Sequence, residues 1–464
     1  MKQLKLLFLT FLLSFVCHAN DSFTFSLADN QKVETTNSFS LAGGSSVHLI
    51  VAKNRDTRDY DVITFFSDSS GNVKEMNLKS FEDKPDFKAA HMYNGCITVL
   101  SHTKKELVVI DYNILSGNVL NKKYDDFTAP VATFFNDNST LMLHPVHKGD
   151  GYLLEVIQNG NSINTMPVTM DEETAKEYKA MLRSDSDIIN TQEYVKNGSL
   201  KPTRIYFEGG NIVFTNDDRG NNTTNAIVID AETGKAALQP FKVNSDNAKE
   251  LTSYVTGKRL FTMNSSKEDI TIKAFGIDDG QEQAAFSLSE NLKEYFGTGN
   301  TKDYLKKIHK TNMKPTLTIN KAGNNYSIRV DAVNTRNYNY HNWWYLHQMM
   351  WQQQQMMNNH LRAMQNHINL MRGPSAQGYS LPLYDAGEEE NYSFTIPLSQ
   401  DLQLMEKGAD EVTDYKEVDK QNLTKQFIEN KSFKYFSTAF GSDAMSYIYM
   451  DKHSETFTIH RIAY

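Results

Sequence analysis

The chain is poor in cysteine, with two among 464 residues. One of them, Cys17, lies in an apolar leading segment, so removal of that segment leaves Cys96 without a partner in the same chain. An intrachain disulfide is then excluded, and a hydrophobic core has to stabilise the fold. The length is sufficient for one large core or for two or three domains of ordinary size.

Clusters of Lys and Arg are also missing. The chain has 48 basic against 56 acidic residues, for a formal net charge of −8. A basic surface is what attracts the phosphate backbone of nucleic acids. The composition therefore argues against a nucleic-acid partner.

Long hydrophobic runs are missing beyond the first residues. The run LLFLTFLLSFV, Leu6–Val16, follows Lys2 and Lys5. It is much shorter than the ~20 residues that span a bilayer and is typical of a secretory signal peptide. We therefore predict an exported protein without a transmembrane segment.

Signal cleavage is predicted after Ala19, which makes residues 1–19 the signal peptide and residues 20–464 a single domain. A lipid anchor on Cys17 is not favoured, because Val16 precedes it where a lipobox has a small residue. The short basic start and the lack of disulfides indicate a bacterial protein, periplasmic or secreted.

Motifs of common catalytic centres are absent from the sequence. It contains no G-x-S-x-G, no H-E-x-x-H, no P-loop and no calcium loop of the EF-hand type. The sequence therefore favours a protein that is not an enzyme and predicts no cofactor.

Pairs of strands joined by a polar turn recur seven times. Each first strand alternates apolar and polar residues, and each partner strand is rich in β-branched and aromatic residues, which favour strands. The first strands are HLIVAK, CITVLS, TLMLHP, NIVFTN, RLFTMN, TLTINK and SYIYMD.

A glycine follows the partner strand at a regular distance. Successive gaps are 46, 43, 74 and 46 residues for Gly71, Gly117, Gly160, Gly234 and Gly280. The long gap contains MDEETAKEYKAMLRS, whose helix formers predict a helical insertion at 171–200. The repeat unit is then roughly 45 residues throughout, the size of a propeller blade.

Seven such units predict an all-β fold, a seven-bladed β-propeller. One β-sandwich or a pair of them is the alternative, since regular strands and turns also describe that architecture. The last unit stops after its third strand, and the amino terminus offers FTFSLAD. We expect this amino-terminal strand to complete the last blade and close the ring.

Two of the units resemble the repeats of PQQ-like and outer-membrane-assembly propellers. In NAIVIDAETGKAAL (Asn225–Leu238) a strand ends in Asp and a Thr-Gly turn follows, and ELVVIDYNILSGNVL is similar. The resemblance implies a propeller architecture and a scaffold role. The blades lack the Trp usual after the Thr-Gly turn, so a quinone cofactor is not expected.

Two further insertions are predicted in the sixth and seventh units. A helical segment rich in Trp, Met and Gln occupies 336–391, and a charged connection occupies 401–425. We assign 336–391 to the link between the third and fourth strands of the sixth blade. It would then lie on the ring face opposite to the helix at 171–200 and the charged connection.

The segment 336–391 carries the candidate binding residues. Its apolar residues recur at helical spacing, which favours an amphipathic helix packed on the ring or against a second copy. Met and Trp are also common interface anchors, so the alternative is a helix that contacts a partner protein or an envelope component. The candidate residues are Trp343, Trp344, Met350, Trp351, Met357, Leu361, Met364, Ile368 and Met371.

The same segment allows a less favoured metal site. His360, Met364, His367 and Met371 follow spacings of 4, 3 and 4, and thioethers with imidazoles suit Cu(I). Contact with a membrane surface through the aromatic cluster at Trp343 is a further alternative. The residues behind the metal and membrane alternatives are also explained as one apolar face of a helix.

Two functions from different classes remain. The first is a non-enzymatic exported scaffold that recognises a protein or an envelope component. The second is a propeller that binds or cleaves a glycan or similar ligand at its central channel, where propellers place polar residues. Carboxylates or histidines that converge at the ring centre would favour the second.

Overall fold

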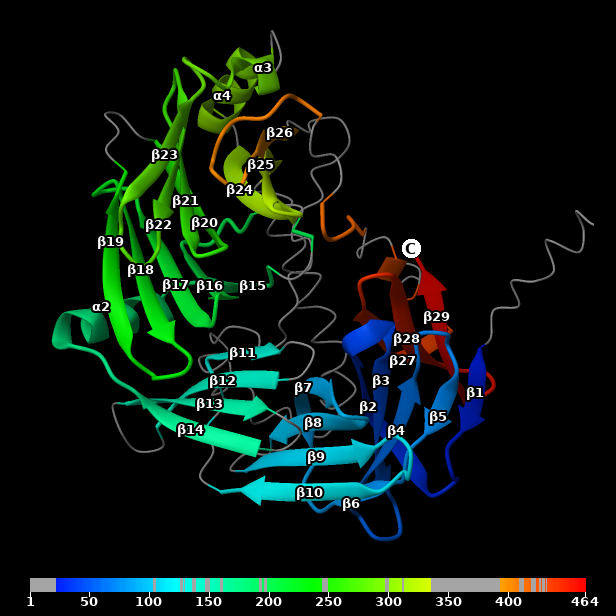
Figure 1. The fold of residues 1–464 in the computed structure, drawn as a ribbon. Helices are drawn as coiled ribbons and strands as arrows, with labels where there is room; N and C mark the ends of the chain where they lie inside the picture. Colours follow the sequence, from blue (N-terminus) through cyan, green and yellow to red (C-terminus); the bar gives the residue numbers. More distant parts are fainter. Residues whose placement is uncertain are drawn as a thin grey trace, which may run out of the picture.

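The computed structural model describes residues 22–464 except for the segment 335–392 and shorter stretches. The shorter stretches are 103–105, 126–127, 129, 136–138, 147–150, 159–161, 192–193, 196–197, 244–248, 297–299, 311–312, 409–412, 419–422, 425–426, 428–429 and 431. The described residues form seven sheets, numbered here in chain order (Figure 1).

The first three sheets contain consecutive antiparallel strands. Sheet 1 consists of β2 (Gln31–Ser40), β3 (Ser46–Asn54), β4 (Tyr60–Ser67), β5 (Val73–Glu75) and β6 (Lys79–Phe81). Sheet 2 consists of β7 (Asp86–Tyr93), β8 (Cys96–His102), β9 (Leu107–Asn113) and β10 (Val119–Tyr124). Sheet 3 consists of β11 (Ala132–Phe135), β12 (Ser139–Pro145), β13 (Tyr152–Gln158) and β14 (Ser162–Val168).

Sheet 4 begins with a short parallel pair and continues antiparallel. Its strands are β15 (Ser186–Ile189), β16 (Thr203–Glu208), β17 (Asn211–Asp218), β18 (Thr223–Asp230) and β19 (Ala236–Lys242). Sheet 5 consists of β20 (Glu250–Thr256), β21 (Arg259–Ser265), β22 (Ile270–Gly276) and β23 (Glu282–Ser287).

The last two sheets differ from simple four-stranded units. Sheet 6 has three strands in the described part of the chain, β24 (Met313–Ala322), β25 (Asn325–Asn334) and β26 (Ser393–Leu398). Sheet 7 joins β27 (Phe433–Phe440), β28 (Ala444–Asp451) and β29 (Thr456–Ala463) to the amino-terminal β1 (Phe23–Ser26). The helices among the described residues are α2 (Glu172–Arg183), α3 (Lys293–Phe296), α4 (Asn300–Lys310) and the short 3₁₀ turn η1 (Ala42–Gly44).

The predicted hairpins are present. The seven strand pairs are β3–β4, β8–β9, β12–β13, β17–β18, β21–β22, β24–β25 and β28–β29, all antiparallel. The period-2 alternation of apolar and polar residues is local, so it identifies strands without knowledge of the fold. The predicted pairing of the amino-terminal strand is also present, because β1 pairs with β29.

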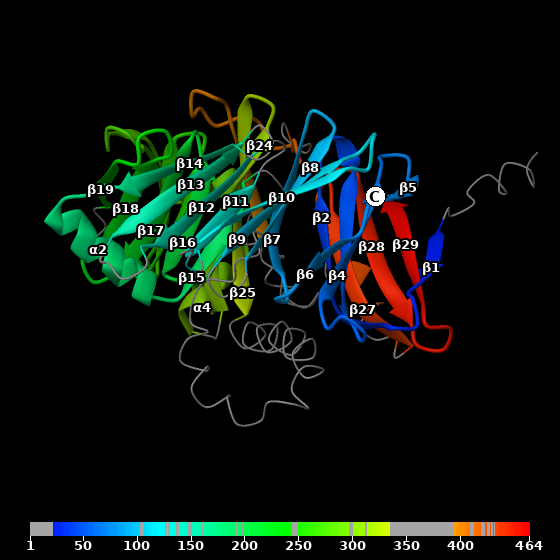
Figure 2. The same ribbon diagram turned by 90° about the horizontal axis from the view of Figure 1, so that it is seen from below.

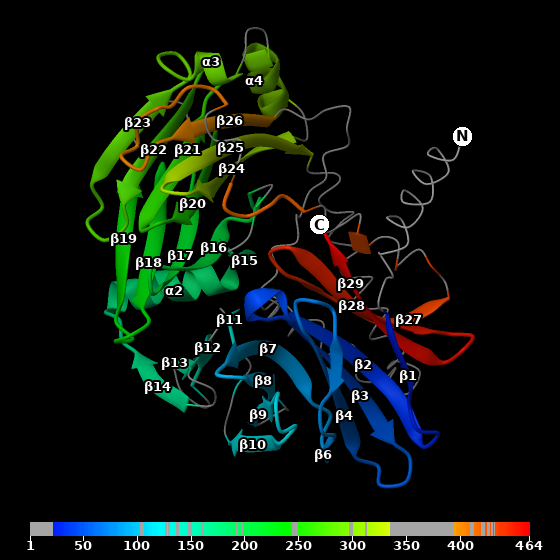
Figure 3. The same ribbon diagram turned by 45° about the vertical axis from the view of Figure 1, so that its right-hand side comes forward.

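Neighbouring sheets pack face to face and bury the core between them. Sheets 1 and 2 share one apolar cluster, sheets 2 and 3 a second, sheets 3 and 4 a third and sheets 4 to 6 a fourth. A further cluster joins sheet 7 to sheet 1, with Phe25 stacked on Phe457 at 5.3 Å. The first strands lie together on the inner side, since β2 contacts both β7 and β27 and β20 contacts β24. This serial packing is propeller-like and differs from a two-sheet sandwich (Figure 3).

The turn glycines have the backbone conformation that the repeat predicts. Gly71, Gly117, Gly234 and Gly280 all have positive φ angles, between 69° and 87°. At Gly234 two features exclude a side chain. The φ angle is positive, and a Cβ would lie 2.5 Å from the Pro167 carbonyl oxygen in the neighbouring sheet.

The predicted assignment within the sixth unit is wrong. The hairpin β24–β25 was expected to supply the second and third strands, but β24 contacts the first strand β20 and is therefore the first strand itself. The connection that contains 336–391 consequently joins the second and third strands, β25 and β26. The end of β25 and the start of β26 therefore lie on the same side of the sheets as the links between sheets, and not on the opposite side.

The helices α3 and α4 are a second difference from the prediction. They occupy the link between β23 and β24, where no insertion was predicted. The helix predicted within 171–200 is present as α2. In the described part of the chain, no helix is long and apolar enough to cross a membrane.

Candidate functional site

The predicted binding helix lies outside the described residues. This applies to Trp343, Trp344, Met350, Trp351, Met357, Leu361, Met364, Ile368 and Met371, and to the metal candidates His360 and His367. The signal peptide and Cys17 lie outside them as well. The candidate site is therefore built from the described elements around this insertion.

The two faces of the propeller-like arrangement of sheets differ in their connections. The turn face carries the links between first and second and between third and fourth strands, such as the tight turns 94–95, 209–210, 257–258 and 323–324. The insertion face carries the other links, which include α2, α3 and α4 and the connection between β25 and β26. Figure 2 shows α4 along the lower edge, on the insertion face.

The helix α2 is firmly attached to sheets 3 and 4. The Asp171 side chain caps it by accepting a hydrogen bond of 2.8 Å from the Thr174 backbone N–H. The buried Tyr178 ring packs edge-on against Tyr152 of sheet 3 at 4.8 Å and against Phe214 of sheet 4 at 5.1 Å. Burial raises the pKa of Tyr178 well above its ordinary value, so its hydroxyl stays neutral.

The helices α3 and α4 cover one face of sheet 6. Phe296 of α3 stacks on Phe394 of β26 at 4.2 Å, and Tyr304 of α4 meets the same ring edge-on at 5.2 Å. The Tyr304 hydroxyl donates a hydrogen bond of 3.2 Å to the Asp331 carbonyl oxygen. Together these contacts fix the strands from which the 335–392 segment departs.

The segment between β15 and β16, residues 190–202, runs from sheet 4 to sheet 6. The Val195 backbone N–H donates to the Asn320 side-chain oxygen at 2.9 Å, and the Asn320 side-chain N–H donates to the Val195 carbonyl at 3.1 Å. Gly198 lies so close to β24 that a Cβ would be 2.5 Å from the Leu317 carbonyl oxygen. This inner segment therefore covers part of the inner edge of β24.

The inner segment also contacts β25. Arg329 donates a hydrogen bond of 3.1 Å to the Tyr194 hydroxyl and two bonds of 3.0 Å to the Asp331 carboxylate. Burial is the largest influence on Tyr194 and raises its pKa. Glu417, from the connection after β26, lies 3.9 Å from Arg329. Three segments far apart in sequence thus meet at one guanidinium group.

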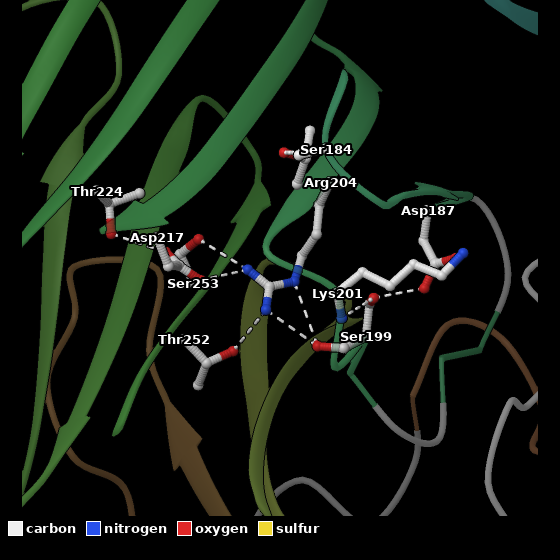
Figure 4. Close-up of polar contacts among 10 residues, drawn as sticks. Ser184, Asp187, Ser199, Lys201, Arg204, Asp217, Thr224, Thr252 and Ser253 are labelled. Carbon is white, nitrogen blue, oxygen red and sulfur yellow. Dashed lines mark hydrogen bonds and ion pairs between the residues drawn. The ribbon is translucent and has the colours of Figure 1, made fainter. Parts of the chain in front are cut away.

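A buried arginine, Arg204, contacts the end of the inner segment where the chain re-enters sheet 4 (Figure 4). Arg204 pairs with Asp217 and donates to the Ser199 carbonyl oxygen at 3.0 Å. It also donates to the hydroxyls of Thr252 at 3.2 Å and Ser253 at 3.4 Å in sheet 5. The guanidinium is almost completely buried, and its partners satisfy it from two sheets and the inner segment.

The carboxylates near the inner edges have basic partners. Asp217 pairs with Arg204, Asp331 with Arg329 and Glu208 with Lys321, the last at 3.8 Å. Such pairing suits a structural role better than proton transfer, which needs a carboxyl group within hydrogen-bond reach of a ligand. In the described residues there is no group of three His, Cys, Asp or Glu side chains that could hold a metal.

Sheets 1 and 7 meet through a buried histidine. His48 Nε2 lies 2.8 Å from the Ser446 hydroxyl, and His48 Nδ1 lies 2.7 Å from the Ser38 hydroxyl, which in turn contacts Ser437 at 2.7 Å. Burial lowers the pKa of His48 to about 3, so the ring is neutral. This polar cluster joins strands from the two ends of the chain.

A buried histidine and a half-buried cysteine lie in sheets 3 and 2. His144 in β12 is 3% exposed, and its Nε2 atom lies 3.4 Å from the Glu155 carboxylate. Cys96 is half-buried at the start of β8, with the Asn113 side-chain nitrogen 3.6 Å away.

Sequence reasoning missed the inner segment and the His48 cluster. Residues 190–202 show neither a helical nor a strand period, and their hydrogen-bond partner Asn320 is 125 positions from Val195. For His48, the one signal available was a histidine inside an otherwise apolar strand. Such a pattern indicates burial but does not identify partners nearly 400 positions away.

Solved structures resemble the chain at low identity. The β-propeller domain of the Trilobed protease from Pyrococcus furiosus is 6% identical over 94% of this chain and 96% of that chain, with a TM-score of 0.33. Hsv2 from Kluyveromyces lactis is 9% identical over 93% and 98%, with a TM-score of 0.28. An uncharacterized protein from Listeria monocytogenes is 9% identical over 68% and 84%, with a TM-score of 0.30.

These TM-scores are too low to transfer any function. No protein-family model matches the chain, and no curated protein matches it.

Proposed function

We propose that the protein is an exported, non-enzymatic β-propeller that binds another protein or a component of the cell envelope through its insertion face. The seven sheets are its seven blades, and β1 closes the ring by completing the last. The contact is made by the insertion at 336–391, through the Trp, Met, Leu and Ile side chains predicted between Trp343 and Met371.

The observation that carries this proposal is the unequal distribution of insertions. The helices α2, α3 and α4 and the link that contains 336–391 all belong to the insertion face, whereas the turn face has tight turns. Solvent-exposed connections that grow on one side of a rigid scaffold are a common way to build a recognition surface. The packing of Tyr178 and Tyr304 anchors the described helices and gives the insertion a fixed platform.

Export is consistent with the position of the first strand. β1 begins at Phe23, so cleavage after Ala19 leaves the whole strand and its pairing with β29 intact. A signal peptide that reached into β1 would destroy this pairing. We therefore keep the predicted boundary.

A ligand site in the ring centre receives less support. The inner segment covers part of β24, and the carboxylates of Asp217, Asp331 and Glu208 have basic partners. An enzyme acting on a glycan would need carboxyl groups free to act as acid and base. These contacts favour recognition at the insertion face.

The test compares capture of envelope proteins by three forms of the chain. We expect the wild type to capture a defined set from a periplasmic and membrane extract after cross-linking, and a variant with residues 340–372 replaced by a Gly/Ser linker to lose that set while keeping the unfolding temperature. The matched control removes apolar groups elsewhere, at the exposed Leu115 and Leu120 (both →Ser). Capture that the linker variant retains in full would contradict the proposal.

A further inference from the structure

Sheet 6 has one strand fewer than the smallest of the other sheets in the described residues. The other six have four or five strands, whereas sheet 6 ends at β26. β26 pairs with β25 through Ser393–Leu398, and in the part of the chain that the structure describes no strand pairs with its outer side. A sheet edge of this kind presents unpaired backbone groups that can accept another strand.

The chain itself begins a fourth strand and then leaves. Leu404 forms a single bridge with Leu398, and the Met405 backbone N–H donates to the Pro397 carbonyl oxygen at 3.1 Å. The chain then turns at Gly408, whose φ angle is 89°. It next reaches the β24–β25 turn, where the Asp414 backbone N–H donates to the Lys321 carbonyl oxygen at 2.8 Å.

These later contacts hold the departing chain away from β26. Asp414 also accepts a hydrogen bond of 2.5 Å from the Gly323 backbone N–H, and Glu417 lies 3.9 Å from Arg329. Asp414 and Glu417 are thus engaged at another part of sheet 6. Among the described residues, no strand lies along the outer edge of β26 from Ser393 to Ile396.

The direction of the backbone groups on β26 follows from Pro397. Its carbonyl oxygen points outward to Met405, and backbone groups two residues apart in a strand point to the same side. The N–H and C=O groups of Thr395 and Ser393 therefore point outward too. Both side chains are exposed, so nothing described on their side of the sheet covers them.

The face of β26 opposite to the Ser393 and Thr395 side chains is apolar and packed. Phe394, Ile396 and Leu398 are buried there, and Phe296 and Tyr304 hold the Phe394 ring. An added strand would continue both faces of the sheet. It would place apolar residues beside Phe394 and Ile396 and polar residues beside Ser393 and Thr395.

We propose that the outer edge of β26 binds an extended segment of a partner protein by strand addition. The segment alternates apolar and polar residues, and its backbone pairs with Ser393 and Thr395. This inference rests on the proposed recognition function and names a mode of recognition for it. Strand addition supplies affinity through main-chain hydrogen bonds and selectivity through alternate side chains.

The test removes one outward N–H group without disturbing the fold. Thr395→Pro deletes an N–H that points away from β25, and Pro397 already occupies an equivalent position in the same strand. Thr395→Val is the matched control, since it keeps the N–H and suits a strand. Circular dichroism and the unfolding temperature verify that both variants are folded.

The probe is a displayed library of ten-residue peptides in which apolar and polar residues alternate. We expect peptides selected on the wild type to bind Thr395→Val equally and Thr395→Pro about tenfold more weakly, in line with the loss of a backbone hydrogen bond and a steric clash. Hydrogen exchange should show a fast Thr395 amide in the free protein and a protected one with peptide bound. The inference would be overturned if the library yields no peptide that binds the wild type. It would also be overturned if the selected peptides bind Thr395→Pro as tightly as the wild type.

Two outcomes separate this inference from the proposed function. If the Thr395 amide is already protected in the free protein, the chain covers its own edge and strand addition is wrong, whatever the capture experiment shows. The second outcome is that Thr395→Pro captures the envelope partner as well as the wild type does, while the linker variant at 340–372 does not. That result would support the proposed recognition function and contradict strand addition at β26. Loss of capture in Thr395→Pro with retention in Thr395→Val supports the inference.

Discussion

The His48 ring and the Ser446 hydroxyl, 2.8 Å apart, connect the first complete sheet of the chain to the last. His48 also contacts the hydroxyls of Ser38 and Ser46, so both ring nitrogens lie near hydroxyl groups that adapt as donors or acceptors. The cluster is buried, and its histidine is neutral because burial lowers its pKa to about 3.

This cluster predicts that stability falls in mild acid. An unfolded histidine binds a proton with a pKa near 6.5, whereas folded His48 does so only near 3, so the unfolded state binds more protons between these values. The contribution of His48 is complete above pH ~6.5 and decreases by about 2 kcal/mol between pH 7 and pH 5. Urea unfolding at both pH values measures it.

The control for this prediction replaces histidines one at a time. His48→Gln should lower stability at pH 7 and flatten the dependence between pH 7 and pH 5, because the titrating group is gone. His453→Gln, in an exposed turn, should leave both unchanged. An equally steep dependence in His48→Gln would show that other groups cause it.

The buried pair of Arg204 and Asp217 predicts a large effect of removing one partner. Asp217→Ala leaves a guanidinium that is 5% exposed without its carboxylate, which typically costs about 3–5 kcal/mol. Arg219→Ala, at a side chain that is 55% exposed and pairs with Glu250, should cost about 0–1 kcal/mol. Denaturant midpoints compare the two, and similar losses would contradict a special role for the buried pair.

The close packing of Gly198 against β24 predicts that a side chain at position 198 destabilises the protein. A Cβ there would lie 2.5 Å from the Leu317 carbonyl oxygen, and a backbone atom of β24 has little freedom to move. We expect Gly198→Ala to cost about 1–3 kcal/mol and to increase proteolytic cleavage within 190–202. Gly220→Ala is the control, because its near neighbour is the flexible side chain of Asp218 at 3.2 Å. Equal stability of the two variants would disprove the close packing.

The amino-terminal strand predicts an effect on both stability and association. Phe25 packs against Phe65 at 4.2 Å and Phe457 at 5.3 Å, so Phe25→Ala should cost roughly 2 kcal/mol. Thr24→Ala, on the exposed side of β1, should cost little. Removal of residues 20–27 should further expose the edge of β29 and promote self-association, measured by light scattering. A monodisperse truncated chain would contradict the role of β1 as an edge cover.

The hairpins and the α2 helix could be predicted because their signals are local. Alternation in CITVLS or NIVFTN and the helix formers around Glu173 depend on residues a few positions apart. Even the pairing of β1 with β29 was accessible, since the last unit lacked a strand and FTFSLAD matched it. The arrangement of sheet 6 was not accessible, because a strand pair does not reveal whether it supplies the first and second or the second and third strands.

The sequence by itself determined which segments form the seven strand pairs and which glycines turn. The alternation of side chains acts within each segment, so these features need no knowledge of the rest of the molecule. Only the tertiary structure decided that Val195 meets Asn320, that His48 meets Ser446 and that β24 is the first strand of sheet 6. These relationships depend on how sheets pack against one another, and packing joins residues whose separation in sequence carries no periodic signal.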